Sequence, residues 1–225
     1  MGYQWNWGIF LSPSASGDDT YLGWMFAGFK MTIALSLSAW ILALILGALM
    51  GVLRTVPNKT LAGIATAYVE LFRNVPLLVQ LFIWYFVLPE LLPTSIGDAY
   101  KQSHPVMQQF LASMVCLGLF TSARVAEQVR AGINSLPKGQ KNAGLALGFT
   151  LPQTYRHVML PMAFRLVVPP LTSEFLNIFK NSAVCSTIGL LELAAQGRQL
   201  VDYTAQPYES FIAVTVLYLL INVVV

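Results

Sequence analysis

The run from Met31 to Leu53 contains no charged residue. It is long enough to supply the ~20 residues that a helix needs to cross the hydrocarbon layer of a membrane. Lipid offers no partners to backbone N–H and C=O groups, so such a run crosses as a helix. The whole chain is 56% hydrophobic and 10% charged, whereas soluble domains carry about 25% charged residues. The sequence therefore predicts an all-α integral membrane protein.

The apolar runs predict about five spans in a single transmembrane domain that covers residues 1–225. The spans are expected at Met31–Leu53, at about Leu61–Leu88, at about Val106–Ile133, after Pro169-Pro170, and from Ser210 onward, where the last is truncated. Residues 1–29 are rich in aromatic side chains, which is typical of an external segment at the membrane interface. Pro76 is expected to bend the second span, Pro89–His104 to form an external loop, and Ser182–Tyr208 to lie outside or partly embedded.

The charges divide unequally between the two sides of these spans. One set of segments carries only basic residues, namely Arg54, Lys59, Lys138, Lys141, Arg156 and Arg165. The other set is mainly acidic, with Asp18, Asp19, Glu90, Asp98, Glu192, Asp202 and Glu209 against Lys101 and Arg198. Basic loops stay in the cytoplasm. We therefore expect a multi-pass membrane protein with its N-terminus outside and residues 135–161 in the cytoplasm.

The basic insert Ser135–Pro170 has the pattern of two short helices joined by a glycine. Ser135 is expected to cap the first helix, with Pro137 in its first turn and Gly148 at its end. These positions predict a compact helical pair on the cytoplasmic side, which we call the knuckle (residues 135–161).

The second helix of the knuckle begins with a stronger signal. Thr150 is followed three residues later by Gln153, which is the spacing of a capping box. Pro161 disfavours helical geometry in the residue before it, so this helix is expected to end near Leu160.

The knuckle carries a recognisable motif. Its segment GQKNAGLALG, residues 139–148, is followed by Leu160-Pro161, and this pattern resembles the EAA loop of ABC-importer permeases. The sequence departs from that loop at its opening Glu, which is Asn142 here, and at its second Ala, which is Gly144. The segments Glu70–Gln80 and Ser173–Ser182 resemble parts of polar amino-acid permeases, and the resemblance is greatest to permeases of glutamate/aspartate importers.

This resemblance implies a type I ABC-importer permease fold in the bacterial inner membrane and a coupling helix that docks on a separate ATPase. The implied coupling residues are Gly139, Asn142, Ala143, Ala146, Leu147, Gly148, Leu160 and Pro161. ATP and magnesium would then be bound by the ATPase subunits, with no cofactor in this chain. A second, homologous permease subunit and a periplasmic amino-acid-binding protein are the other implied partners. The sequence does not decide between a homodimer and a heterodimer.

Four polar residues in the predicted spans are candidates for the translocation site: Gln80, Thr121, Glu174 and Asn177. A carboxylate inside a span is costly, so Glu174 would face a substrate amino group or another protein group. Alternatively, Glu174 pairs with Lys180 or with a basic residue of a neighbouring helix, such as Arg73. A structural pair is also expected between Glu70 and Arg73, and mutual pairing is expected among Arg124, Glu127 and Arg130.

The sequence contains no phosphate-binding GxxxxGK[ST] loop, HExxH zinc motif or GxSxG elbow, so we expect no catalytic or metal site. The net charge of +3 reports the basic cytoplasmic loops and does not indicate a nucleic-acid partner. Two other functional classes remain open. One is an intramembrane enzyme that uses Glu174 with His157 or Cys185, and the other is a secondary transporter that works without ATP, although no internal repeat is apparent.

Overall fold

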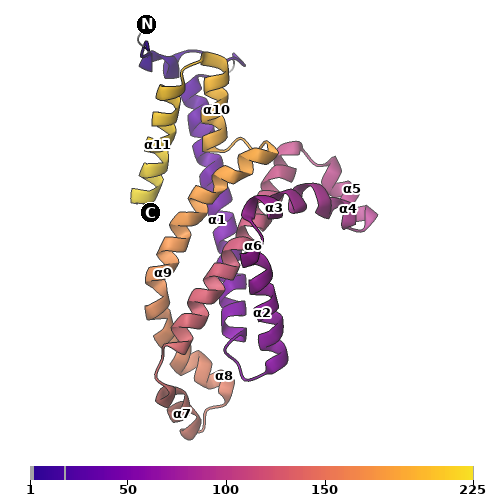
Figure 1. The fold of residues 1–225 in the computed structure, drawn as a ribbon, viewed down its shortest axis with the longest axis vertical. Coiled ribbons are helices and arrows are strands. Elements are labelled where there is room, and N and C mark those ends of the chain that lie inside the picture. Colours follow the sequence, from indigo (N-terminus) through magenta and orange to yellow (C-terminus); the bar gives the residue numbers. More distant parts are fainter. Residues whose placement is uncertain (1–2, 18, 225) are drawn as a thin grey trace. The chain divides into compact units, whose positions relative to one another are not determined.

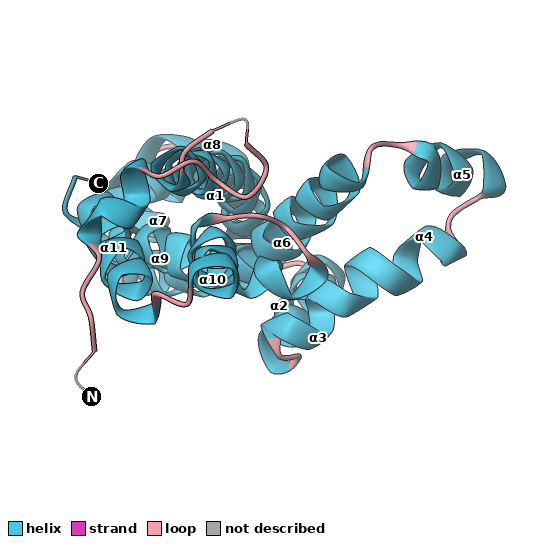
Figure 2. Cartoon of the chain, turned by 90° about the horizontal axis from the view of Figure 1, so that it is seen from above, coloured by secondary structure: helices cyan, strands magenta, loops and turns pink. Residues whose placement is uncertain are grey.

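The computed structural model describes residues 3–17 and 19–224, so the predicted external residue Asp18 lies outside the described part. These residues form helices joined by short turns (Figure 2). The α-helices are α1 Tyr21–Leu53, α2 Lys59–Asn74, α3 Leu77–Phe82, α4 Leu88–Leu91, α5 Thr94–Gln102, α6 Pro105–Asn134, α7 Lys138–Ala146, α8 Leu151–Thr154, α9 Leu160–Asn181, α10 Leu193–Thr204 and α11 Pro207–Val224. Two π-helical turns, η2 Ile83–Val87 and η3 Tyr155–Met159, and two 3-10 helices, η1 Trp7–Leu11 and η4 Ser182–Ile188, complete the described elements.

Among residues 3–17 and 19–224, three helices are long and apolar enough to cross a membrane, namely α1, α6 and α11. Two further pairs pass the same test only together: α2 with Leu77–Leu91, bent by 102°, and Leu151–Ile188 with α10, bent by 50°. Counting each bent pair as one span gives five, which is the number that the sequence predicts. The expected bend at Pro76 is a sharp break, because α2 stops at Asn74 and a new helix starts at Leu77.

Several predicted boundaries are wrong. Helix α1 begins at Tyr21, ten residues before Met31, because Lys30 does not interrupt a helix and its flexible stem tolerates an apolar surrounding. The predicted external segment therefore loses its last residues to α1, and Tyr21 is buried in a core. The predicted loop Pro89–His104 contains α4 and α5.

The prolines of the fourth predicted span do not delimit a helix. Pro161, Pro169 and Pro170 all lie inside α9, which continues from the knuckle to Asn181. The π-helical turn η3 comes directly before α9, and a widened turn gives the ring of Pro161 room that a regular turn lacks. Membrane helices tolerate internal prolines where neighbouring groups supply the lost hydrogen bonds.

The chain divides into two compact units. Unit 1 comprises residues 1–38, 77–116 and 178–225, and its core joins the first turns of α1 to α10 and α11 (Figure 1). Gly28 lets α1 approach the start of α10, because a Cβ there would lie 3.0 Å from the Cα of Leu193. Two acidic side chains are buried in this unit: Glu192 caps α10 and accepts a hydrogen bond from Tyr218, and Glu209 accepts from the Asn6 amide.

Unit 2 comprises residues 39–76 and 117–177 and contains α2, the knuckle and the adjoining parts of α1, α6 and α9. Helices α1 and α6 pack closely at two glycines, since a Cβ on Gly47 or Gly51 would lie 2.7 or 2.8 Å from backbone oxygens of α6. A second contact joins the end of α6 to the knuckle through Ile133, Tyr155 and Met159. This unit holds the charged clusters and the EAA-like segment of the knuckle.

Candidate functional site

The knuckle contains α7, a turn at Gly148, α8 and the π-helical turn η3. Gly148 has φ 85°, a left-handed conformation that glycine adopts without steric cost, as its predicted place at a helix end requires. The predicted capping box is present: the Gln153 amide donates to Thr150 Oγ1, and the Thr150 amide donates to Gln153 Oε1 at 2.8 Å. The predicted cap at Ser135 is wrong, because that residue lies in the turn after α6, where its amide donates to the Ala131 carbonyl. Pro137 lies just before α7, at the N-cap position and without a side-chain capping bond, so it is not in the first turn as predicted.

A side chain of α8 fixes the angle between the two knuckle helices. A Cβ on Gly144 would lie 2.8 Å from Thr154 Cγ2, so Gly144 permits this close approach. The Tyr155 hydroxyl donates to the Thr55 carbonyl at 2.8 Å and ties the knuckle to the turn after α1. Beside this contact lies a half-polar cavity of about 370 Å³ whose lining includes Asn134, Lys141 and Asn142.

Most of the predicted coupling residues lie on the open surface of the knuckle. Gly139, Asn142, Ala143, Ala146, Leu147 and Gly148 are exposed, and Leu147 is 78% exposed. Leu145 and Phe149 are exposed beside them, and the motif did not single these two out. Leu160 instead packs against the core formed by Ile133, Tyr155 and Met159, while Pro161 is exposed on α9. Apolar side chains exposed together commonly mark a contact with another protein.

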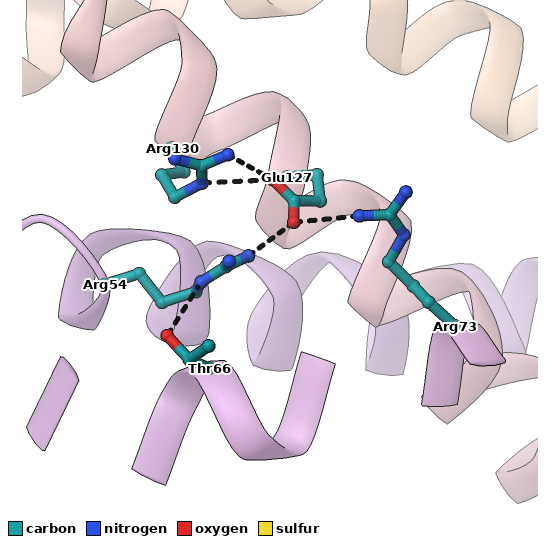
Figure 3. A network of polar contacts seen from close by, with 5 residues as sticks. All are labelled: Arg54, Thr66, Arg73, Glu127 and Arg130. Atoms are coloured by element: carbon teal, nitrogen blue, oxygen red, sulfur yellow. Dashed lines mark hydrogen bonds and ion pairs between the residues drawn. The ribbon is translucent and has the colours of Figure 1, made fainter. Parts of the chain in front are cut away.

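Above the knuckle, three guanidinium groups converge on the carboxylate of Glu127 (Figure 3). Arg54 and Arg73 donate to Glu127 Oε1 at 2.6 and 2.9 Å, and Arg130 contacts Oε2 through two nitrogens at 2.9 and 3.0 Å. Arg54 also donates from Nε to Thr66 Oγ1 at 3.3 Å. We call these four charged residues the Glu127 cluster. It connects the end of α1, the end of α2 and the C-terminal half of α6.

The Glu127 cluster corrects one predicted pair and confirms another. The Glu127–Arg130 pair has the expected three-residue spacing. Arg73 reaches Glu127, whose position on α6 is remote in the sequence, instead of Glu70. Arg124 also takes no part in this cluster, because it pairs with Glu174 on α9.

The Arg124–Glu174 pair joins the helices that carry three of the translocation candidates. Arg124 Nε lies 3.3 Å from Glu174 Oε2. Thr121 lies three residues before Arg124 on α6, and Asn177 lies three residues after Glu174 on α9, so each is a neighbour on the same helix face. Thr121 is buried and Asn177 is half-buried. The fourth candidate, Gln80, is buried in α3 of unit 1.

The sequence offered as an alternative that Glu174 pairs with a basic residue of a neighbouring helix, and this is what the structure shows. The partner is Arg124, however, and not Lys180 or Arg73. Sequence reasoning missed Arg124, since its spacing to Glu127 and Arg130 suggested a pair along one helix. The sequence did offer one signal: Arg124 lies within a predicted span and has no acidic residue one helical turn before it that could neutralise its charge.

Comparison with known proteins places this fold. Residues 43–225 match the family described as binding-protein-dependent transport system inner membrane component. The chain belongs to this family. The glutamate/aspartate import permease protein of Escherichia coli is 60% identical over 99% of this chain and 91% of its own length. A probable glutamine ABC transporter permease protein of Bacillus subtilis is 36% identical over 87% of this chain and 85% of its own length.

Solved structures agree with the family. The crystal structure of an amino acid ABC transporter with histidines has a chain that is 29% identical, with a TM-score of 0.76, covering 91% of this permease and 90% of that chain. An inward-facing structure of the MetNI methionine ABC transporter has a TM-score of 0.75 at 23% identity, covering 90% of this permease and 91% of that chain, which shows the fold alone. The permease has the all-helical type I ABC-importer fold and is a transport subunit, so the interpretation as an intramembrane enzyme is wrong.

Proposed function

We propose that this permease carries an acidic amino acid, glutamate or aspartate, across the bacterial inner membrane. The observation that carries the proposal is the 60% identity over almost the whole chain with a glutamate/aspartate import permease. A relative with another substrate in its name, the probable glutamine permease of Bacillus subtilis, is 36% identical. Residues Gln80, Thr121, Glu174 and Asn177 are the proposed lining of the path.

The knuckle is the proposed docking element for the ATPase. Its exposed apolar side chains Leu145, Leu147 and Phe149 are suited to a groove in a partner subunit, and Lys141 and Asn142 line a half-polar cavity beside them. The sequence has no phosphate-binding loop, so ATP and magnesium would be bound by that partner. Movement of the knuckle would reach the spans through α9, which continues from η3 without a break.

The remaining partners are a second, homologous permease subunit and a periplasmic amino-acid-binding protein. The N-terminus is proposed to lie outside, because Lys141 and its basic neighbours belong to segments of one side and Asp98 to the other. Single cysteines in place of Lys141 and Asp98 test this orientation. A membrane-impermeant thiol reagent added to intact spheroplasts should modify position 98 only, and the opposite result would invert the topology.

Transport itself is tested with the complete complex in lipid vesicles. The permease is purified with its ATPase and partner permease, and its binding protein and radiolabelled glutamate, aspartate or glutamine are supplied outside. We expect uptake of glutamate and aspartate with ATP inside, and none with a non-hydrolysable ATP analogue. Uptake driven by an ion gradient without ATP would support a secondary transporter and contradict the proposal.

Coupling through the knuckle is tested with two glycines that differ in one property. Neither Gly148 nor Gly63 has an atom within 4 Å of an added Cβ, but only Gly148 has a positive φ. A left-handed conformation costs a non-glycine residue roughly 1–2 kcal/mol, so Gly148→Ala should change the knuckle angle and abolish ATPase stimulation by the loaded binding protein. Gly63→Ala is the control and should behave as the wild type. Normal stimulation in the Gly148 variant would remove the knuckle from the coupling route.

A further inference from the structure

We propose that Arg124 is a carboxylate-binding residue of the translocation path, held in place by Glu174 until an acidic amino acid arrives. The inference rests on the proposed function, since it concerns how that substrate is recognised. It assigns a charged role to α6 in addition to the polar candidates Thr121, Glu174 and Asn177.

The first support is the way in which Arg124 is bound. Its contact with Glu174 uses Nε alone, at 3.3 Å, and the described residues give its two terminal nitrogens no ion pair. The guanidinium also lies 5.7 Å from the centre of the Phe120 ring, which supports it from one side. Two terminal N–H groups of a guanidinium form the fork that fits a carboxylate. Arg124 is therefore positioned by its neighbours while its strongest recognition groups remain available.

The second support is that the Arg124 side chain is exposed although it lies well inside a predicted span. The Arg124 side chain is 42% exposed, whereas that of Glu174 is 11% exposed. Arg124 lies ten residues before the end of α6 at Asn134, which corresponds to about 15 Å along the helix. An arginine at this depth does not face hydrocarbon, because placing a charged side chain at the centre of a membrane helix costs about 2.5–3.5 kcal/mol in insertion experiments. Its exposed groups must face a watery path or another polar partner.

The third support is charge balance. An acidic amino acid carries two carboxylates and one ammonium group, so a site whose only charged member is Glu174 would repel it. Arg124 supplies the missing positive charge next to Glu174. Glu174 uses Oε2 in this contact, which leaves Oε1 for the ammonium group of the substrate. The pair thus presents one charge of each sign to a ligand that carries both.

The experiment measures ATP-driven glutamate uptake by the complete complex in vesicles at saturating binding protein. Arg124→Gln should lower the uptake rate by at least about tenfold, in line with losing a hydrogen bond to a charged group. Arg124→Lys should lose less, because it keeps the charge without the fork. Arg165→Gln is the matched control, since Arg165 is exposed on α9 and remote from the pair, and it should transport as the wild type does.

A charge swap separates recognition from structural support. The double variant Arg124→Glu with Glu174→Arg keeps an ion pair between α6 and α9, so we expect the complex to assemble while uptake stays low. Wild-type uptake by Arg124→Gln, or its restoration by the swap, would overturn the inference and leave the proposed function intact. A wild-type complex that takes up no acidic amino acid would overturn the proposed function, and the inference with it.

Discussion

Unit 2 contains two carboxylates that pair with arginine, and they are bound in different ways. Glu127 accepts from Arg54, Arg73 and Arg130, so both of its oxygens are occupied by short contacts. Within the described part of the chain, Glu174 has one ion pair, to Arg124 at 3.3 Å. Both carboxylates join α6 to another helix. One is saturated with partners and the other retains a free acceptor position.

This difference suits the two carboxylates to different roles: Glu127 to structural support, and Glu174 to the binding of a further charged group. A carboxylate surrounded by three cations cannot release one of them without leaving positive charges close together. The Glu127 cluster is therefore suited to hold α1, α2 and α6 in one arrangement. A carboxylate with one partner can accept a substrate ammonium group in addition. The following variants test whether the carboxylate with three partners contributes to stability and whether the carboxylate with one partner contributes to transport.

The largest effect is expected from Glu127→Gln. It leaves Arg54, Arg73 and Arg130 adjacent without a counter-charge. Breaking a buried ion pair costs at least about 3 kcal/mol of unfolding free energy, and because Glu127 is 21% exposed we expect a cost of about 3 kcal/mol. The measurement is the thermal unfolding of the purified complex and its yield on size-exclusion chromatography. Glu70→Gln is the control, because Glu70 is exposed on α2. Equal stability of the two variants would show that the three arginines do not need Glu127.

A smaller effect separates two arginines of the same cluster. Arg54 is 10% exposed and also donates to Thr66, whereas Arg73 is 51% exposed. Arg54→Gln should cost about 1.5–3 kcal/mol, because a buried charged hydrogen bond is lost. Arg73→Gln should cost about 0–1 kcal/mol, as exposed ion pairs do. The same unfolding assay checks both values, and the reverse order would mean that burial does not determine the strength of these pairs.

The contrast between the clusters could be predicted only in part from the sequence. Signals that act over one helical turn were sufficient for the Thr150–Gln153 capping box, the positive φ at Gly148 and the Glu127–Arg130 pair. The apolar runs likewise predicted five spans, which agrees with the described helices when each bent pair is counted as one span. Arg54 and Arg73 are more than fifty positions from Glu127 in the sequence. No local pattern indicates which of several basic residues will pair with Glu127 in the folded chain.

The prolines of α9 show a second limit. Pro161, Pro169 and Pro170 each predict a helix boundary from local sterics, yet the helix continues through all three. The π-helical turn before Pro161 relieves that local conflict, and neither it nor the packing around α9 is encoded in a short motif. The candidate coupling residues of the knuckle came from the resemblance to a known family. The ion-pair partner of Glu174, in contrast, could be identified only from the three-dimensional arrangement.

The smallest effect on stability, and the most informative one for function, is expected from Glu174→Gln. Gln keeps the size of the side chain and a carbonyl acceptor for Arg124, whose guanidinium is already 42% exposed and can be hydrated. Removing the charge also removes the cost of burying a carboxylate whose side chain is 11% exposed, so the two effects offset each other and the unfolding free energy should change by less than about 1 kcal/mol. The complex should assemble and hydrolyse ATP at its basal rate, while glutamate uptake falls because the ammonium group has lost its counter-charge. Loss of assembly, at a cost like that of Glu127→Gln, would make Glu174 a second structural carboxylate and remove the distinction between the two regions.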